Sequence, residues 1–200
     1  AGIVIEKPIP VDTKGPPPRD ANGLRYVIGL DRDELAGVFR DLGEPEKSLR
    51  MRANQLWHWI YHRGATDFGV MTTIAKGLQE KLGETCTLDR GTVENHQQSS
   101  DGTAKWLVRY ADGALIETVL IPEDDRGTLC VSSQVGCTLN CSFCHTGTQA
   151  WVRNLGPREI VSQIMIARDG LGEWPTPMEG RKISNIVMMG MGEPLYNLDN

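Results

Sequence analysis

The chain has 200 residues, of which 40% are hydrophobic and 24% charged, and its net charge is −5. This composition is typical of a globular protein of one or two domains, and it excludes a collagen, a coiled coil or a wholly disordered chain. No apolar run approaches the roughly 18 residues that a membrane helix needs, and the N-terminus lacks the pattern of a secretory signal. We therefore expect no membrane partner, and the odd number and clustered positions of the cysteines favour a reducing, cytoplasmic setting. The acidic balance argues against a globally basic nucleic-acid binder but allows a local basic patch.

The first 86 residues predict a proline-rich tail followed by a helical module. Residues 1–23 hold five of the eleven prolines and no apolar repeat, so we predict a disordered tail there. Residues 24–86 predict three helices, over 31–42, 50–62 and 73–82. Asp31 and Glu34 have the spacing of a capping box at the start of the first helix. This module is too small to hold an obvious catalytic pocket of its own.

The second predicted helix carries aromatic and basic residues that could contact RNA. Trp57 and Tyr61 could stack on bases, and the neighbouring arginines give the segment a local positive face. Trp59 could stack as well, but its place on the apolar face favours the core. His58 and His62 are four residues apart and could bind a metal, although no third ligand is evident and a surface pair is favoured. We predict that residues 24–86 are an accessory module that binds RNA.

The hydrophobic period changes after the module. Residues 103–110 and 114–121 predict strands, separated by Asp112-Gly113, which is a hairpin signal. We therefore predict a β-hairpin extension over 87–127. A strand over 128–135, a helix from Pro157, a loop over 172–182 and a buried strand over 183–191 then form a βαβ unit. The predicted fold is α/β: a helical module and a hairpin extension, followed over 128–200 by the start of a partial (β/α) barrel.

Three of the five cysteines lie within eight residues, as Cys137, Cys141 and Cys144. An odd, clustered set is a poor disulfide framework and a good metal framework. Three thiolates can ligate three irons of a [4Fe–4S] cluster and leave the fourth iron open to a substrate or cofactor. The alternatives are a zinc site completed by His145, or three buried thiols.

The spacing C-x3-C-x2-C, with Phe143 just before the last cysteine, resembles the radical SAM superfamily. In that superfamily the open iron chelates S-adenosylmethionine, and the cofactor is cleaved to a deoxyadenosyl radical. A second mark is a Gly-Glu-Pro turn after a later strand, here Gly192-Glu193-Pro194. The resemblance implies that Gly192 and Glu193 hold the ammonium of S-adenosylmethionine. A carboxylate pairs well with an ammonium, and glycine permits a close approach.

Longer strings resemble the RlmN/Cfr family of radical SAM RNA methyltransferases, over roughly residues 24–200. They include Ile116-Glu117-Thr118-Val119, residues 128–137 and residues 187–195. The resemblance implies methyl transfer to carbon 2 of adenosine in 23S rRNA and tRNA by a monomer. It also implies a [4Fe–4S] cluster, S-adenosylmethionine and an electron donor such as flavodoxin or ferredoxin. Carbon-8 transfer, as in the Cfr branch, and a non-catalytic fragment that binds a cluster or RNA are the alternatives.

The resemblance also implies two catalytic residues. In the family, a cysteine near the C-terminus carries the methyl group, and a second cysteine resolves the adduct with a disulfide forming. Cys130 matches the second cysteine, and Glu117 matches a glutamate that accepts a proton. From the residues alone, Cys130 would be a small buried side chain and Glu117 part of a solvated strand face. No cysteine follows Cys144, so we expect an N-terminal fragment of a longer enzyme that does not transfer methyl groups by itself.

Overall fold

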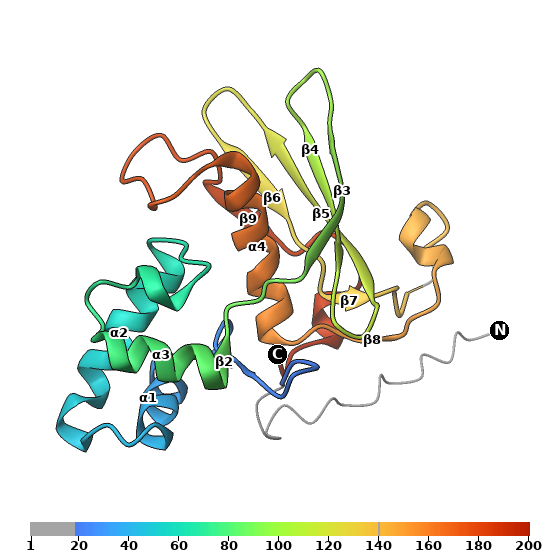
Figure 1. Ribbon diagram of the computed structural model, residues 1–200. Helices are drawn as coiled ribbons and strands as arrows, with labels where there is room; N and C mark the ends of the chain where they lie inside the picture. Colours follow the sequence, from blue (N-terminus) through green and yellow to red (C-terminus); the bar gives the residue numbers. More distant parts are fainter. Residues whose placement is uncertain (1–18, 140) are drawn as a thin grey trace.

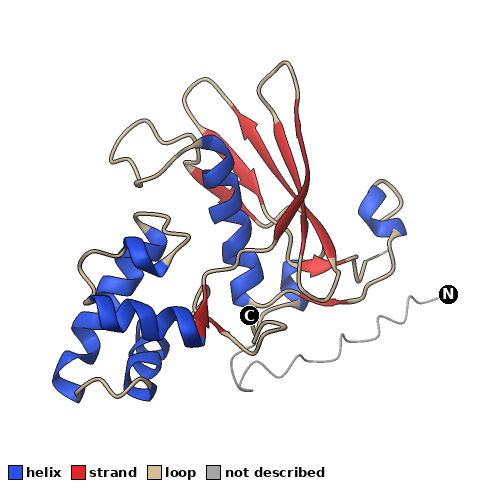
Figure 2. Cartoon of the chain, viewed as in Figure 1, coloured by secondary structure: helices blue, strands red, loops and turns tan. Residues whose placement is uncertain are grey.

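The computed structural model describes residues 19–139 and 141–200. Three helices near the N-terminus form one group, and a twisted sheet with a further helix on its face forms another (Figure 1). Short strands and loops join the two groups (Figure 2). The helices are α1 (Arg32–Asp41), α2 (Glu46–Tyr61), α3 (Lys76–Thr85) and α4 (Pro157–Leu171). Among the described residues, no helix has both the length and the apolar composition needed to cross a bilayer.

The helices of the N-terminal group begin where their capping residues place them. Asp31 accepts hydrogen bonds from the backbone amides of Asp33 and Glu34, and Glu34 accepts one from Asp31, which confirms the predicted capping box. Helix α2 begins four residues earlier than predicted, directly after Pro45, which serves as its N-cap. The apolar faces of the three helices pack together. Their fully buried members include Leu35, Phe39, Leu56, Ile60 and Leu82.

Five strands form the main sheet in the order β3-β4-β5-β6-β9. They are β3 (Thr92–Gln98), β4 (Ala104–Arg109), β5 (Leu115–Pro122), β6 (Gly127–Cys130) and β9 (Asn185–Val187). The predicted hairpin of β4 and β5 is confirmed, and β6 pairs antiparallel with β5. Strand β9 pairs parallel with β6, and α4 joins the two. This is the predicted βαβ unit, and the described strands do not close into a barrel.

Helix α4 lies between the sheet and the N-terminal helices. Its Ile166 and Ala167 pack against the sheet, where Ile116 and Leu129 are fully buried. On another side of the same helix, Met165 belongs to the core of the N-terminal helices. The two hydrophobic cores therefore share one helix, which fixes the sheet relative to the helical group (Figure 1).

Three sequence predictions about the strands need correction. Strand β3 was not expected, because its seven residues are all exposed and mostly polar and show no alternating pattern. The strand predicted over 128–135 ends at Cys130, and residues 134–135 form β7 (Gln134–Val135), which pairs with β8 (Arg153–Asn154). The strand predicted as buried over 183–191 is only three residues long. It lies at the sheet edge, where Ile186 is half exposed and Met189 is 79% exposed.

The prediction of a disordered tail over 1–23 falls largely outside the described residues, which begin at Arg19. Residues 19–23 form an ordered turn, contrary to that prediction. The Asp20 carboxylate accepts hydrogen bonds from the backbone amides of Asn22 and Leu24. This turn leads into β1 (Arg25–Tyr26), which pairs with β2 (Cys86–Thr87) at the end of α3.

Candidate functional site

The three clustered cysteines lie on a loop between β7 and β8, which we call the cysteine loop (residues 136–150). Its ends are held together because the Cys137 amide donates to the Gln149 carbonyl and residues 137 and 150 form a β-bridge. Gly136 has a φ of +74°, and a Cβ there would lie 2.1 Å from the Ala150 carbonyl oxygen. Only glycine fits this turn. The path of the backbone into Cys137 is therefore fixed by the close contact between residues 136 and 150.

The cysteine loop closes a second time around Cys141 and Cys144. The Cys144 amide donates to the Cys141 carbonyl at 3.1 Å. A Cβ on Gly147 would lie 2.9 Å from the backbone of Cys141, so the chain approaches closely there as well. The Gly147 amide donates to the Cys144 carbonyl at 3.1 Å, and the backbone amides of Gly147 and Thr146 lower the pKa of the Cys144 thiol by hydrogen bonding. Hydrogen bonds of this kind favour a thiolate, which is the form that binds a metal.

The cysteine loop offers a donor set suited to an iron–sulfur cluster. All five cysteines have free thiols, and those of Cys137, Cys141 and Cys144 are partly exposed. Among the described residues, no group of three or more His, Cys, Asp or Glu side chains is close enough to hold a single metal ion. Three soft thiolates on one short loop nevertheless match the ligands of a [4Fe–4S] cluster. His145, the alternative zinc ligand, is exposed in the short helix His145–Thr148.

The Gly-Glu-Pro turn follows β9 and lies beside β7. Gly192 has a φ of +96°, and a Cβ there would lie 2.5 Å from the Cβ of Gln134. The Glu193 amide donates to the side-chain oxygen of Gln134 at 3.0 Å. One carboxylate oxygen of Glu193 accepts from the Leu195 amide at 3.0 Å. The structure thus packs Gly192 and Glu193 against the strand that leads into the cysteine loop.

Glu117 and Cys130 lie on the sheet face that α4 does not cover. On β5, Ile116 and Thr118 are buried beneath α4, so Glu117 points to the opposite face. Cys130 pairs in register with Val119, two residues along β5, and therefore shares that face. Burial raises the pKa of the Cys130 thiol. The Glu117 carboxylate forms a 3.0 Å ion pair with Lys105 from β4.

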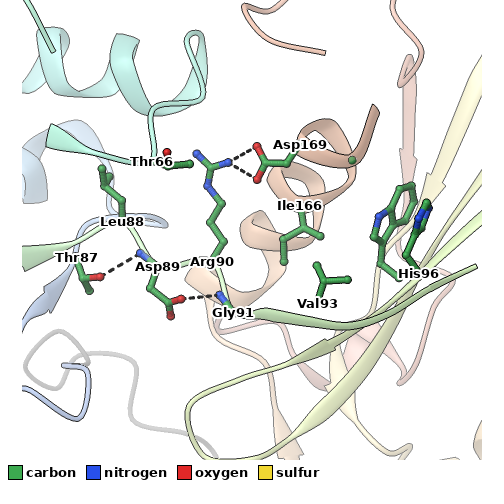
Figure 3. A pocket seen from close by; sticks show the side chains of 12 residues that line it. Thr66, Thr87, Leu88, Asp89, Arg90, Gly91, Val93, His96, Ile166 and Asp169 are labelled. Carbon is green, nitrogen blue, oxygen red and sulfur yellow. Dashed lines mark hydrogen bonds and ion pairs between the residues drawn. The ribbon is translucent and has the colours of Figure 1, made fainter. Parts of the chain in front are cut away.

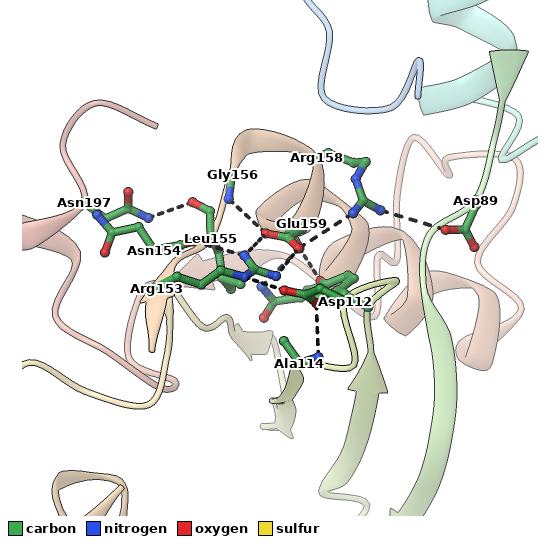
Figure 4. A network of polar contacts seen from close by, with 12 residues as sticks. Asp89, Asp112, Ala114, Arg153, Asn154, Leu155, Gly156, Arg158, Glu159 and Asn197 are labelled. Atoms are coloured by element: carbon green, nitrogen blue, oxygen red, sulfur yellow. Dashed lines mark hydrogen bonds and ion pairs between the residues drawn. The ribbon is translucent and has the colours of Figure 1, made fainter. Parts of the chain in front are cut away.

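An arginine network anchors the segment that leaves the cysteine loop. Arg153 on β8 pairs with Glu159 of α4 at 2.7 Å and with Asp112 of the β4–β5 turn at 2.7 Å (Figure 4). Glu159 is nearly buried and also accepts from the Gly156 amide. The hydrogen bond from Arg153 lowers the pKa of Asp112. Arg153 therefore ties the end of the cysteine loop to the sheet and to α4.

A cavity of about 660 Å³ lies where the helical group meets the sheet (Figure 3). The Arg90 guanidinium projects along it and pairs with Asp169 of α4. Arg90 also donates to the carbonyls of Gly64 and Ala65 in the helical group. His96 stacks on Trp106 at another side of the cavity. None of the predicted site residues lines this cavity, and Arg90 joins the two groups across it.

The exposed side of α2 is basic and partly aromatic. A cavity of about 630 Å³ there is lined in part by Lys47, Arg50 and His58. The rings of His58 and His62 lie 4.7 Å apart, and burial, with the neighbouring His62 and Arg63, lowers the pKa of His58. The described residues supply no third metal ligand near this pair.

The aromatic residues of α2 are only partly buried. Trp59 packs against the helical core, and its indole nitrogen donates to the Thr73 hydroxyl at 2.8 Å. Trp57 also packs at the edge of that core and lies under the Arg32 guanidinium at 4.3 Å. Both indoles therefore contribute to packing, and each keeps part of its surface in contact with solvent.

Comparisons with known proteins find similar RNA methyltransferases over the helical group and over the sheet that follows it. Residues 27–88 match the model of the ribosomal RNA large subunit methyltransferase N-terminal domain. A dual-specificity RNA methyltransferase RlmN from Rhodospirillum rubrum is 62% identical over 87% of this chain and 40% of its own length. The RlmN from Rhizorhabdus wittichii is 57% identical over 100% of this chain and 48% of its own length.

The chain belongs to the RlmN family. A solved structure, that of a radical SAM methyltransferase from Sphaerobacter thermophilus, has the same fold. It matches with a TM-score of 0.74 and 40% identity over 91% of this chain and 49% of that chain. The chain spans about half the length of the curated RlmN relatives it matches.

Several polar residues around the RlmN-type loops were not found by reasoning from the sequence. Lys105 was predicted only as part of a strand, yet its ammonium forms an ion pair with the Glu117 carboxylate. Gln134 and Ser132 are fully buried. The Ser132 hydroxyl donates to the Glu117 carbonyl and accepts from the Met191 amide, and the Gln134 side chain accepts from the Glu193 amide. The polar run Ser132-Ser133-Gln134 interrupts an apolar strand, and that interruption is the signal that could have found two of them.

Proposed function

We propose that this protein is a radical SAM RNA methyltransferase that modifies carbon 2 of adenosine in 23S rRNA and in tRNA. The observation that carries the proposal is the 62% identity with an enzyme named for dual-specificity RNA methylation. The local geometry is compatible with this chemistry. The Gly-Glu-Pro turn follows β9, and the face that bears a thiol and a carboxylate belongs to β5 and β6 of the same sheet. The three-cysteine loop joins β7 and β8, a separate pair of strands, and hydrogen bonds of Gln134 with Met191 and Glu193 connect β7 to the Gly-Glu-Pro turn.

Each site residue has a role in this proposal. Cys137, Cys141 and Cys144 hold a [4Fe–4S] cluster, and Gly192 and Glu193 hold the ammonium of S-adenosylmethionine. When bound, the cluster supplies one electron for the reductive cleavage of that cofactor. Backbone contacts close the cysteine loop at Cys137 and between Cys141 and Cys144, and the glycine at 192 lets the turn pack directly against β7.

Glu117 and Cys130 act on the RNA base from the open sheet face. The raised pKa keeps the Cys130 thiol protonated until a general base removes its proton. Glu117 accepts a proton during the reaction. The 3.0 Å ion pair with Lys105 orients the Glu117 carboxylate on this face. The family's methyl-carrying cysteine has no match in this sequence, since no cysteine follows Cys144.

The basic side of α2 contacts the RNA backbone in this proposal. Arg50 and His58 supply donors for phosphate there, and Lys47 adds a further positive charge. The reaction also needs an electron donor such as flavodoxin or ferredoxin, and we propose that the enzyme acts as a monomer in the cytoplasm.

Deleting the gene that encodes this chain tests the RNA product directly. We expect 2-methyladenosine to disappear from 23S rRNA and tRNA, as measured by mass spectrometry of the nucleosides. Loss of 8-methyladenosine instead would establish the Cfr-like alternative. Unchanged levels of both nucleosides would contradict the proposal.

Anaerobic reconstitution with iron and sulfide tests the radical chemistry. We expect visible absorption that dithionite bleaches, and 5′-deoxyadenosine when S-adenosylmethionine is added. The Cys141→Ala variant is the matched control and should give neither. A colourless protein that retains zinc would contradict the cluster assignment.

A further inference from the structure

Gln134 is a fully buried side chain between the two loops proposed to hold the cofactors. Its side-chain oxygen accepts from the Glu193 amide at 3.0 Å and from the amide and hydroxyl of Thr138 at 3.4 and 3.3 Å. Thr138 follows Cys137 directly, and Glu193 is the central residue of the Gly-Glu-Pro turn. Among the described residues, Gln134 is the one side chain that hydrogen bonds to both segments.

The chemistry of its partners fixes the orientation of this amide. Backbone amides can only donate, so the atom facing Glu193 and Thr138 has to be the oxygen. The nitrogen then faces Asn154, and it donates to the Asn154 side-chain oxygen at 2.8 Å. Asn154 donates in turn to the Tyr196 carbonyl at 3.0 Å, beyond the Gly-Glu-Pro turn. The network therefore has one arrangement in which all of these partners are satisfied.

Backbone packing leaves the turn little freedom to move away from Gln134. Gly192 adopts a positive φ, and a side chain there would overlap the Gln134 Cβ. The Met191 carbonyl accepts from the amides of Ser133 and Gln134, at 2.8 and 3.2 Å. These contacts bring the turn to β7, and the Gln134 side chain extends the connection to Thr138 on the cysteine loop.

We infer that Gln134 is a positioning residue, whose amide oxygen holds Glu193 in register with the cysteine loop. The inference rests on the proposed function, because it concerns the distance between the cluster ligands and the cofactor's ammonium site. An apolar side chain of similar size would leave the amides of Glu193 and Thr138 without an acceptor. The cysteine loop and the Gly-Glu-Pro turn could then move relative to one another, and the affinity for S-adenosylmethionine would fall.

The test compares four proteins: the wild type, Gln134→Met, Gln134→Glu and Gln163→Met. Gln163 is a matched control, since it is equally buried and its amide hydrogen bonds to both backbone groups of Ser132 but to neither loop. Each protein is reconstituted anaerobically and reduced with dithionite, and its iron content is measured. S-adenosylmethionine is then titrated while the electron paramagnetic resonance spectrum is followed.

We expect iron contents within about twofold in all four proteins, because no cysteine has changed. The S-adenosylmethionine concentration at half-maximal spectral change should rise about tenfold in Gln134→Met, the effect of losing one or two hydrogen bonds. Gln134→Glu keeps the acceptor for Glu193 and Thr138 but loses the donor to the Asn154 side-chain oxygen, so its rise should be smaller than that of Gln134→Met, at about threefold. Gln163→Met should stay within about twofold. Should Gln134→Met fail to fold, Gln134→Asn replaces it, because its shorter amide cannot reach both loops.

Two results would overturn the inference. One is a wild-type concentration dependence in Gln134→Met, or in Gln134→Asn where that variant replaces it. The other is an equal rise in Gln163→Met, which would mean that any buried polar loss has this effect. A wild-type protein that binds iron but shows no spectral change with S-adenosylmethionine would instead refute the proposed function, so the two failures are distinguishable.

Discussion

The two faces of the main sheet differ in what they contact. Ile116, Leu120 and Leu129 project toward α4 and are almost wholly buried. Glu117 and Cys130, from the same strands, project to the other side and remain partly exposed. Alternation along a strand therefore divides β5 and β6 into a packing side and a side that carries the two proposed catalytic groups. A substitution on one face should change stability, and one on the other should change chemistry.

The largest expected effect on stability is at the buried face. Leu129→Ala removes a fully buried side chain beneath α4 and should lower the free energy of unfolding by about 3 kcal/mol. Val119→Ala, on the other face of the neighbouring strand, should cost about 1 kcal/mol or less. Urea unfolding followed by circular dichroism measures both. Equal losses would show that the two faces are not divided in this way.

The arginine network behind the cysteine loop should give the next largest effect. Arg153→Met removes two short contacts of the nearly buried Glu159 and leaves it the longer 3.7 Å pair with Arg158, and we expect a loss of about 2 kcal/mol. The matched control is Arg109→Met, whose partner Glu94 is exposed. That variant should unfold at nearly the same urea concentration as the wild type, because solvent screens an exposed pair. If both variants unfold at the same urea concentration, the Arg153 pair does not anchor the loop.

A smaller effect should appear in the pH dependence of stability. The hydrogen bond from Arg153 lowers the pKa of Asp112 in the folded protein. Its contribution to stability is therefore complete above the unfolded pKa of about 4, and it is lost as the pH falls through the lower folded value. Thermal unfolding between pH 6 and pH 3 should show a steeper loss in the wild type than in Asp112→Asn. Parallel curves for the two proteins would argue against this linkage.

The smallest effect on stability is expected at the proposed catalytic pair. Glu117 and Lys105 are each about 40% exposed, so Glu117→Gln should change the free energy of unfolding by less than about 0.5 kcal/mol. The same substitution, introduced into the chromosomal gene, should abolish 2-methyladenosine in 23S rRNA. Normal 2-methyladenosine in that strain would remove Glu117 from the mechanism.

Sequence patterns predicted the elements whose residues carry strong local signals. The capping box at Asp31 and the hairpin signal at Asp112-Gly113 each mark an element that the structure contains. Strand β3 has no such signal, because it forms by pairing with β4 and buries none of its own side chains. Strand β9 looked buried because its residues are apolar, but at the edge of the described sheet they have few partners.

The cysteines of the candidate site could be identified from spacing, but their surroundings could not. A C-x3-C-x2-C motif is local, whereas the bond from Glu193 to Gln134 joins residues 59 positions apart. The pairing of Lys105 with Glu117 likewise depends on the register of β4 and β5. The cysteine motif is visible in the sequence, whereas the partners that Gln134 and Lys105 contact are evident only in three dimensions.

The iron content of two cysteine variants tests most directly whether the cluster is held by the cysteine loop and not by the open sheet face. Cys144 lies on the cysteine loop and Cys130 on the open sheet face, and both thiols are free and partly exposed. After anaerobic reconstitution, we predict about four irons per chain in the wild type and in Cys130→Ala, and little iron in Cys144→Ala. Equal iron in the two variants, or zinc in place of iron, would contradict the account.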